Sequence, residues 1–134
     1  MEGVVSRTIV LVEDDGVIRK WVRTVLLAEG YQVIEAEDGE QGLKLAEDHR
    51  GPIDLLLTAV AMPRRTGPEL AKRLLSSRAD LKVIYMSGPV DHTFARSMLG
   101  ESATIVQKPL TQERLVQNVR EVLATRKGYG ARAP

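Results

Sequence analysis

Three consecutive acidic residues, Glu13, Asp14 and Asp15, close an apolar stretch that begins at Thr8. Adjacent carboxylates repel one another, so cations or hydrogen-bond donors must offset their charge. Mg²⁺ is a natural partner, because it takes oxygen ligands and keeps several of its waters. The alternative is that Asp15 caps the helix that follows while the other two carboxylates are solvated. A phosphate-cradling loop is excluded here, since such a loop is rich in glycine and free of acids.

Two other polar residues follow apolar stretches later in the chain. Lys108 precedes Pro109, and Ser87 precedes Gly88 and Pro89. A lysine opposite an acidic cluster can pair with carboxylates or with a phosphoryl group, and a serine hydroxyl can donate to a phosphoryl oxygen. Taken alone, Lys108 is best interpreted as a surface lysine and Ser87 as a turn serine.

The elements that must position these residues can be predicted from hydrophobic spacing. Three segments are predicted as buried strands by their length and β-branched residues, and two weaker ones join them. The strong strands are Thr8–Val12, Ile53–Leu57 and Lys82–Met86, and the weaker ones are Tyr31–Ala36 and Thr104–Gln107. Apolar residues three and four apart predict helices between them. These helices are Val17–Glu29, Asp38–His49, one beginning near Pro68, a shorter one over Val90–Leu99, and Gln112–Thr125.

Strand and helix thus alternate five times, which indicates a parallel sheet covered by helices on both faces. In such a sheet, function lies outside the carboxyl ends of the strands. The acidic run, Ser87 and Lys108 all follow predicted strands. We expect one domain over residues 7–126, a loose leader over 1–6 and a tail or linker over 127–134.

Composition narrows the function classes. The 134 residues carry 19 Lys and Arg against 18 Asp and Glu, so a dedicated nucleic-acid binder is not expected. There is no cysteine, which removes disulfides and thiolate sites, and the two histidines are far apart in sequence. No signal peptide or membrane-spanning segment is visible. We expect a small cytoplasmic domain without membrane insertion.

Five separated motifs, in order, resemble the receiver domain of bacterial two-component response regulators. They are LVEDD, the GY before the second strand, DLLLTAVAMPRRTGPEL, YMSG and QKP, and the resemblance runs from Thr8 to about Thr125. It implies a single-domain α/β fold: a flavodoxin-like, doubly wound (βα)5 parallel sheet in the strand order 2-1-3-4-5. It also implies a role in phosphorelay signal transduction, close to receivers attached to hybrid kinases, without autonomous catalysis.

Position 59 departs from the family pattern. There the family carries the aspartate that accepts a phosphoryl group from a histidine kinase, whereas this chain has Ala59. A methyl group cannot form an acyl phosphate. Thr58 offers no rescue, because strand alternation turns it to the opposite face.

Other family roles carry over by resemblance. Asp14 matches the direct magnesium ligand, Glu13 matches the ligand that usually works through water, and the backbone carbonyl of Ala61 matches the third protein ligand. Without a carboxylate at position 59, we expect any Mg²⁺ to be held weakly. Ser87 and Lys108 match the residues that contact the phosphoryl group during switching. The Lys-Pro bond of the family is commonly cis, so a cis Lys108–Pro109 bond would fit the resemblance.

Ile105 stands three residues before Lys108, where active receivers usually carry an aromatic switch residue. Two explanations of Ala59 remain open. In the first, this is a naturally degenerate receiver, which Ile105 and Ala61 favour. In the second, it is an ordinary phospho-accepting receiver whose aspartate has been replaced by alanine. A magnesium-dependent phosphatase that uses Asp14 is a remote third alternative, since its companion motifs are missing.

The resemblance implies a histidine kinase or another signalling protein as partner. Family partners dock on the first helix, here near Arg19–Arg23, or on the face built by the fourth helix, fifth strand and fifth helix, here near Ile105–Val116. A homodimer through the latter face fits the same pattern. No direct contact with nucleic acid is expected.

Overall fold

The structure is a computed structural model and describes residues 6–125. Five strands and five helices alternate along this part of the chain. The strands are β1 (Thr8–Val12), β2 (Gln32–Ala36), β3 (Leu55–Ala59), β4 (Lys82–Ser87) and β5 (Thr104–Gln107). The helices are α1 (Gly16–Ala28), α2 (Gly39–Asp48), α3 (Gly67–Leu75), α4 (His92–Leu99) and α5 (Gln112–Ala124). All five strands are parallel, in the order β2-β1-β3-β4-β5, which confirms the predicted fold.

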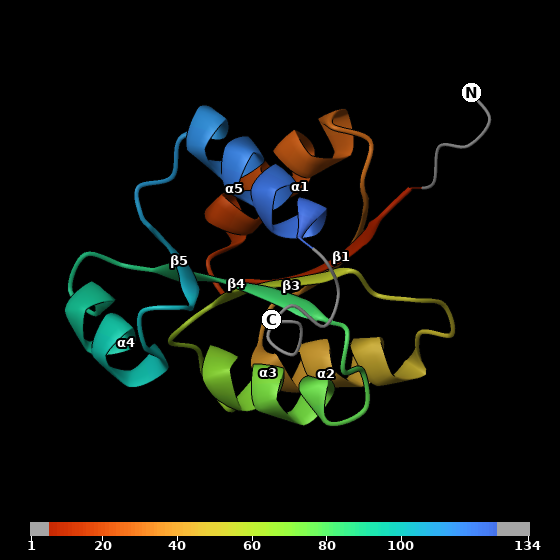
Figure 1. The fold of residues 1–134 in the computed structure, drawn as a ribbon, viewed down its shortest axis with the longest axis horizontal. Helices are drawn as coiled ribbons and strands as arrows, with labels where there is room; N and C mark the ends of the chain where they lie inside the picture. Colours follow the sequence, from red (N-terminus) through yellow and green to blue (C-terminus); the bar gives the residue numbers. More distant parts are fainter. Residues whose placement is uncertain (1–5, 126–134) are drawn as a thin grey trace.

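The helices form a layer on each side of the sheet. Figure 1 shows α1 and α5 on one face and α2 and α3 on the other, with α4 beside α3. Each face has its own apolar core, because alternate residues of a strand point to opposite sides. Ile9, Leu11, Leu57 and Met86 pack toward α1 and α5, whereas Val10, Val12, Leu56 and Tyr85 pack toward the other helices.

The bounds of β3 correct the prediction. The strand covers Leu55–Ala59 rather than Ile53–Leu57, because Thr58 pairs with Val12 of β1 and Ala59 pairs with Met86 of β4. Asp54 lies just before the strand, where its carboxylate accepts a hydrogen bond from the N–H of Thr8 at 2.8 Å. A continuous apolar run shows that a strand is buried but does not set its ends.

Most other elements differ from the predicted bounds by one residue at an end, and α4 differs by two. α4 begins at His92 rather than Val90, and β4 extends to Ser87. The expected leader, apart from Ser6, and the expected tail lie outside the described residues. The division into leader, domain and tail therefore stays a prediction.

Side-chain caps fix where the helices begin. Asp15 accepts the N–H groups of Val17 and Ile18 and so caps α1, as its position predicted. Thr66 and Glu69 form a reciprocal capping box at α3. α2 and α5 are capped in the same way by Asp38 and Thr111, whereas α4 has no side-chain cap.

Gly67 at the start of α3 is required by close packing on the end of β3. A Cβ at this position would lie 2.2 Å from the carbonyl oxygen of Ala59, which is backbone and cannot turn away. We predict that Gly67→Ala lowers the free energy of unfolding by about 1–3 kcal/mol, as overpacking does. Urea unfolding measures the change. Gly16→Ala is the matched control at another helix start, where the nearest atom is 3.7 Å away, and it should change stability by less than about 1 kcal/mol. Equal losses in both variants would contradict the packing argument.

Candidate functional site

The strand ends meet at one edge of the sheet, and backbone hydrogen bonds hold them together beyond the strands. The N–H of Val60 donates to Met86 at 3.0 Å, and the N–H of Lys108 donates to Ser87 at 2.8 Å. Between β1 and β2, the N–H of Glu13 donates to Ala36 at 3.2 Å. The residues predicted to follow the strands therefore lie side by side along this edge.

Glu13 and Lys108 form an ion pair across that edge. Glu13 is the first residue after β1, and its side chain is only 1% exposed. The ammonium nitrogen of Lys108, which follows β5, lies 2.9 Å from Glu13 Oε1. The contact is an ion pair between a buried carboxylate and a half-buried ammonium group. The sequence predicted that a lysine here could face the acids, and the structure assigns it to Glu13.

The burial of Glu13 dominates its electrostatics. Loss of water around the carboxylate raises the pKa of Glu13 above its ordinary value of 4.5. The Lys108 ammonium and the N–H of Asp15, which donates to Oε2 at 3.1 Å, lower this pKa in part. The carboxylate of Asp14 beside it raises the pKa further. Glu13 is thus a buried acid whose counter-charges do not fully replace water.

The rest of the acidic run has different roles. Asp15 is used as the cap of α1, and the side chain of Asp14 is exposed. Arg19, predicted only as part of a docking region, also contacts this loop: it donates to the carbonyl of Glu13 at 2.7 Å and to Glu35 Oε1 at 3.2 Å. Arg23 contacts the other oxygen of Glu35 at 3.0 Å, so this carboxylate anchors both arginines of α1.

Ala59 is the last residue of β3 and is 2% exposed. Alternation places it on the same side of the sheet as Leu57, toward α1 and α5. Thr58 faces the other side, as predicted. Its hydroxyl donates to the carbonyl of Ala59 at 3.0 Å and lies 4.0 Å from the sulfur of Met62. The hydroxyl of Thr58 therefore does not replace a missing group at position 59.

Ser87 is engaged by a partner that the sequence did not predict. Its buried hydroxyl lies 2.7 Å from Nδ1 of His92, in the first turn of α4. The proton sits on either atom, depending on the tautomer of His92. Ile105, at the predicted switch position, is half-buried and packs against the core under α2, α3 and α4. No periodic pattern in the sequence links Ser87 to His92, five residues later at the start of α4.

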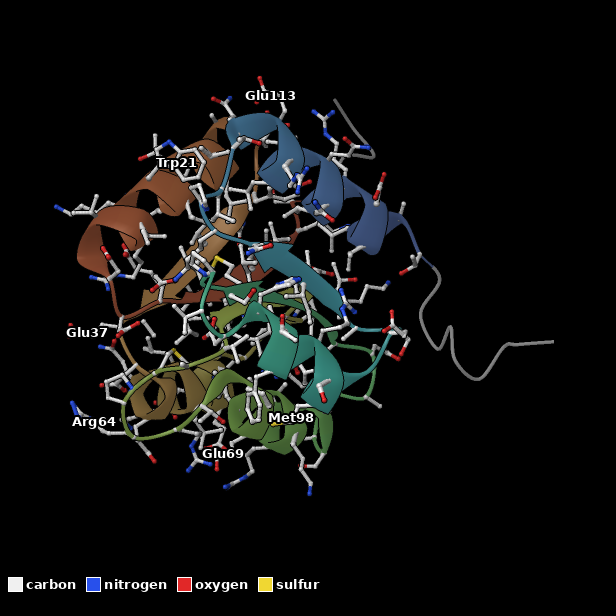
Figure 2. The ribbon with its side chains drawn as sticks, turned by 90° about the vertical axis from the view of Figure 1, so that its left-hand side faces the viewer. Trp21, Glu37, Arg64, Glu69, Met98 and Glu113 are labelled. Atoms are coloured by element: carbon white, nitrogen blue, oxygen red, sulfur yellow. The ribbon has the colours of Figure 1, made fainter. Side chains whose placement is uncertain are left out.

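The loop between β3 and α3, which carries Ala61, is tied to the start of α2. Arg64 contacts Asp38 at 3.2 Å, and the next residue, Arg65, contacts Glu40 at 3.1 Å. Arg64 has a positive φ of 70°, which turns the two consecutive side chains toward α2 from one short loop. Figure 2 shows Arg64 and Glu37 on the side of the molecule where the strands end. Exposed ion pairs of this kind contribute little individually, but together they fix one path for the loop.

The residues predicted to hold Mg²⁺ are partly engaged by partners within the chain. One oxygen of Glu13 faces the Lys108 ammonium, the other accepts the N–H of Asp15, and position 59 has only a methyl group. Among residues 6–125, no cluster of three or more His, Cys, Asp or Glu side chains is placed to hold a metal ion. Asp14 and a backbone carbonyl would leave most positions around Mg²⁺ to water, which agrees with the expectation of weak binding.

A response regulator receiver domain model matches residues 9–120 of this chain. The chain belongs to the receiver domain family. It is 33% identical to the sensor kinase CckA of Brucella abortus over 119 residues, which is 88% of this chain and 13% of the kinase. It is 29% identical to the response regulator receiver protein CpdR of the same organism, covering 87% of this chain and 97% of that protein.

Solved receiver structures agree with the fold. The crystal structure of the receiver domain from the hybrid histidine kinase CckA superimposes with a TM-score of 0.73 at 32% identity, covering 87% of this chain and 98% of that one. This chain is therefore similar to receivers found both alone and inside a kinase. It is a receiver domain of two-component signalling, and the five motifs correctly predicted its family. Within residues 6–125, no helix is long and apolar enough to cross a membrane.

The raised pKa of Glu13 predicts how its contribution to stability changes with pH. The folded receiver binds a proton at Glu13 more tightly than the unfolded chain does. The contribution of Glu13 to the free energy of unfolding therefore falls as pH rises from 4.5 through the raised pKa. We expect the free energy of unfolding of the native chain, minus that of Glu13→Gln, to decrease over this range. Urea unfolding of both proteins in chelator, at steps from about pH 4.5 to 7.5, measures this difference. An increase with pH would show that the Lys108 ion pair outweighs the loss of water.

Proposed function

We propose that this receiver domain accepts no phosphoryl group at position 59 and signals by protein–protein contact, without catalysis of its own. The observation that carries the proposal is Ala59 at the end of β3, in the position that the family resemblance gives to the phosphoacceptor. The neighbours support it, because Lys108 contacts Glu13 and Ser87 contacts His92. In this arrangement both phosphoryl-contact positions already have partners within the chain.

A second candidate is an ordinary phospho-accepting receiver in which the aspartate at position 59 has been replaced by alanine. Glu13, Asp14, Ser87 and Lys108 favour it, since the other residues of a phosphorylation site are present. Ile105 favours the degenerate receiver, because an aliphatic side chain packed on the core cannot act as an aromatic switch. Restoring the aspartate tests the two candidates.

We propose a histidine kinase or another signalling protein as the partner, acting in the cytoplasm. Two exposed apolar surfaces support docking. A groove of about 310 Å³ runs between α1 and the loop after β5, lined by Val17, Ile18, Trp21, Lys108, Pro109 and Leu110. The second surface consists of Phe94 and Met98 of α4 and of Val90 just before the helix, which are exposed and four residues apart. Figure 2 shows Trp21 and Met98 on opposite sides of the sheet, so the two surfaces are separate. If two copies of the chain pair through α4, β5 and α5, their contact would include the second surface.

The first test is phosphorylation by a small donor. We expect acetyl phosphate with Mg²⁺ to leave the mass of the native chain unchanged, because Ala59 has no carboxylate to form an acyl phosphate. Ala59→Asp should gain one phosphoryl group if the other site residues still function. Ala61→Asp is the matched control, because it adds the same carboxylate two residues later at an exposed position. Intact-protein mass spectrometry followed by peptide mapping measures all three.

The outcomes separate the candidates. A phosphoryl group on the native chain between residues 55 and 66 would refute the proposal. Phosphorylation of Ala59→Asp but not Ala61→Asp would show that the site needs only its aspartate and would favour the second candidate. No modification of either variant favours the degenerate receiver, since the site would then have lost more than one residue.

The second test is the stability of Ala59→Asp. Its carboxylate would join Glu13 and Asp14 opposite a single Lys108. A like-charge contact near 4 Å is worth roughly 4 kcal/mol at an effective dielectric of about 20, and solvent and Lys108 reduce the net cost to about 1–2 kcal/mol. We expect the variant to be less stable than the native chain in chelator, and millimolar Mg²⁺ to restore much of the loss. Urea unfolding with and without Mg²⁺ measures the four values. A variant as stable as the native chain without metal would show that residue 59 does not face the acids.

A further inference from the structure

Lys108 reaches Glu13 across the ends of two other strands. The order β2-β1-β3-β4-β5 places β3 and β4 between them. Three strand spacings of about 4.8 Å separate β1 from β5, about 14 Å in all. Both side chains must therefore extend along the sheet edge for their charges to meet at 2.9 Å. The path passes the end of β3, where Ala59 has only a methyl group.

The acidic loop is already supplied with positive charge and N–H donors from the chain. Lys108 contacts one oxygen of the Glu13 carboxylate, and the N–H of Asp15 donates to the other. Arg19 donates to the Glu13 carbonyl. The carboxylate of Asp15 accepts two N–H groups of α1. The exposed carboxylate of Asp14 is not used as a cap in this loop.

We infer that the Lys108 ammonium is the resident cation of this pocket and that it takes the place of a divalent metal ion on Glu13. A divalent ion on Asp14 could use Glu13 only through one of its waters, and that water would have to compete with the ammonium for a carboxylate that is 1% exposed. The direct protein ligands of such an ion would be only Asp14 and a backbone carbonyl. An ammonium on a flexible stem, with three donors, fits a single buried carboxylate better.

The ion pair between Lys108 and Glu13 also shapes the groove beside α1. Lys108 lines that groove together with Trp21, so the ion pair on Glu13 also fixes one wall of the groove. The shape of this surface should then be the same with and without divalent metal. The inference concerns cation binding and does not depend on whether position 59 can be phosphorylated.

The test compares metal binding by the native chain, Lys108→Met and Lys44→Met. Lys44 is the matched control, because it is also ion-paired, with Asp48 at 3.3 Å, but on the exposed surface of α2. Mn²⁺ is titrated against ¹⁵N-labelled protein, and selective broadening of the amides of residues 13–15 and 61 reports binding at the pocket. Mg²⁺ is then titrated while the fluorescence of Trp21, the single tryptophan, is followed.

We expect no selective broadening and no saturable fluorescence change in the native chain or in Lys44→Met, corresponding to a Kd weaker than roughly 10 mM. Lys108→Met should bind at least about tenfold more tightly, because Glu13 then lacks its cation. Selective broadening of residues 13–15 and 61 in the native chain would overturn the inference. So would unchanged metal affinity in a folded Lys108→Met.

A second comparison keeps the inference testable if Lys108→Met does not fold. Lys108→Arg retains the positive charge at the same position and should, like the native chain, show no selective broadening. Ala59→Asp, which adds a carboxylate while keeping Lys108, serves as the positive control for detecting metal. Native binding as tight as that of Ala59→Asp overturns the inference, and its absence, with Ala59→Asp binding metal, supports it.

Discussion

A carboxylate buried at the end of a strand must be given partners by the fold, and in this chain Glu13 receives them from two places. Lys108 supplies a charge from beyond β5, and Asp15 supplies an N–H from the entry to α1, where Arg19 also binds the backbone carbonyl of Glu13. Removing a carboxylate from water costs several kcal/mol, so losing Lys108 or the N–H of Asp15 would leave this charge poorly compensated. The entry to α1 and the end of β5 are therefore fixed relative to β1 by one side chain.

The positions of the strand ends could be predicted from sequence because parallel strands place their carboxyl ends at a common edge. Residues 13, 59, 87 and 108 were placed there by hydrophobic patterning and by the family resemblance, and Asp15 was correctly predicted as a cap. The bounds of β3 were predicted two residues too early. They depend on pairing with Val12 and Met86, residues that are distant in sequence from Thr58 and Ala59.

The partners of the site residues could not be predicted in the same way. Lys108 can reach several positions along the edge, and only the three-dimensional packing selects Glu13. His92 contacts Ser87 because α4 begins two residues later than expected, which places its first residue beside the end of β4. Arg64 and Arg65 contact α2 through a loop with a positive φ at a non-glycine residue, for which the sequence contains no marker. In each case the local sequence determines the helix, strand or loop that carries the residue. Its side-chain partner depends on how segments distant in sequence pack together.

The contacts of Ser87 and Lys108 bear on how α4 is held. Of the eight residues of α4, Ala95 alone is buried, so the helix has little apolar area holding it to the sheet. The Ser87–His92 contact joins its first turn to β4, and Lys108 joins the neighbouring end of β5 to β1. A residue that had to follow a phosphoryl group would need to leave such a partner, and the cost of leaving a buried acid or hydroxyl unpaired opposes that movement. Ser87 and Lys108, the positions that contact the phosphoryl group in phospho-accepting receivers, here link β4 to α4 and β5 to β1, in keeping with the proposed receiver that is not switched by phosphorylation.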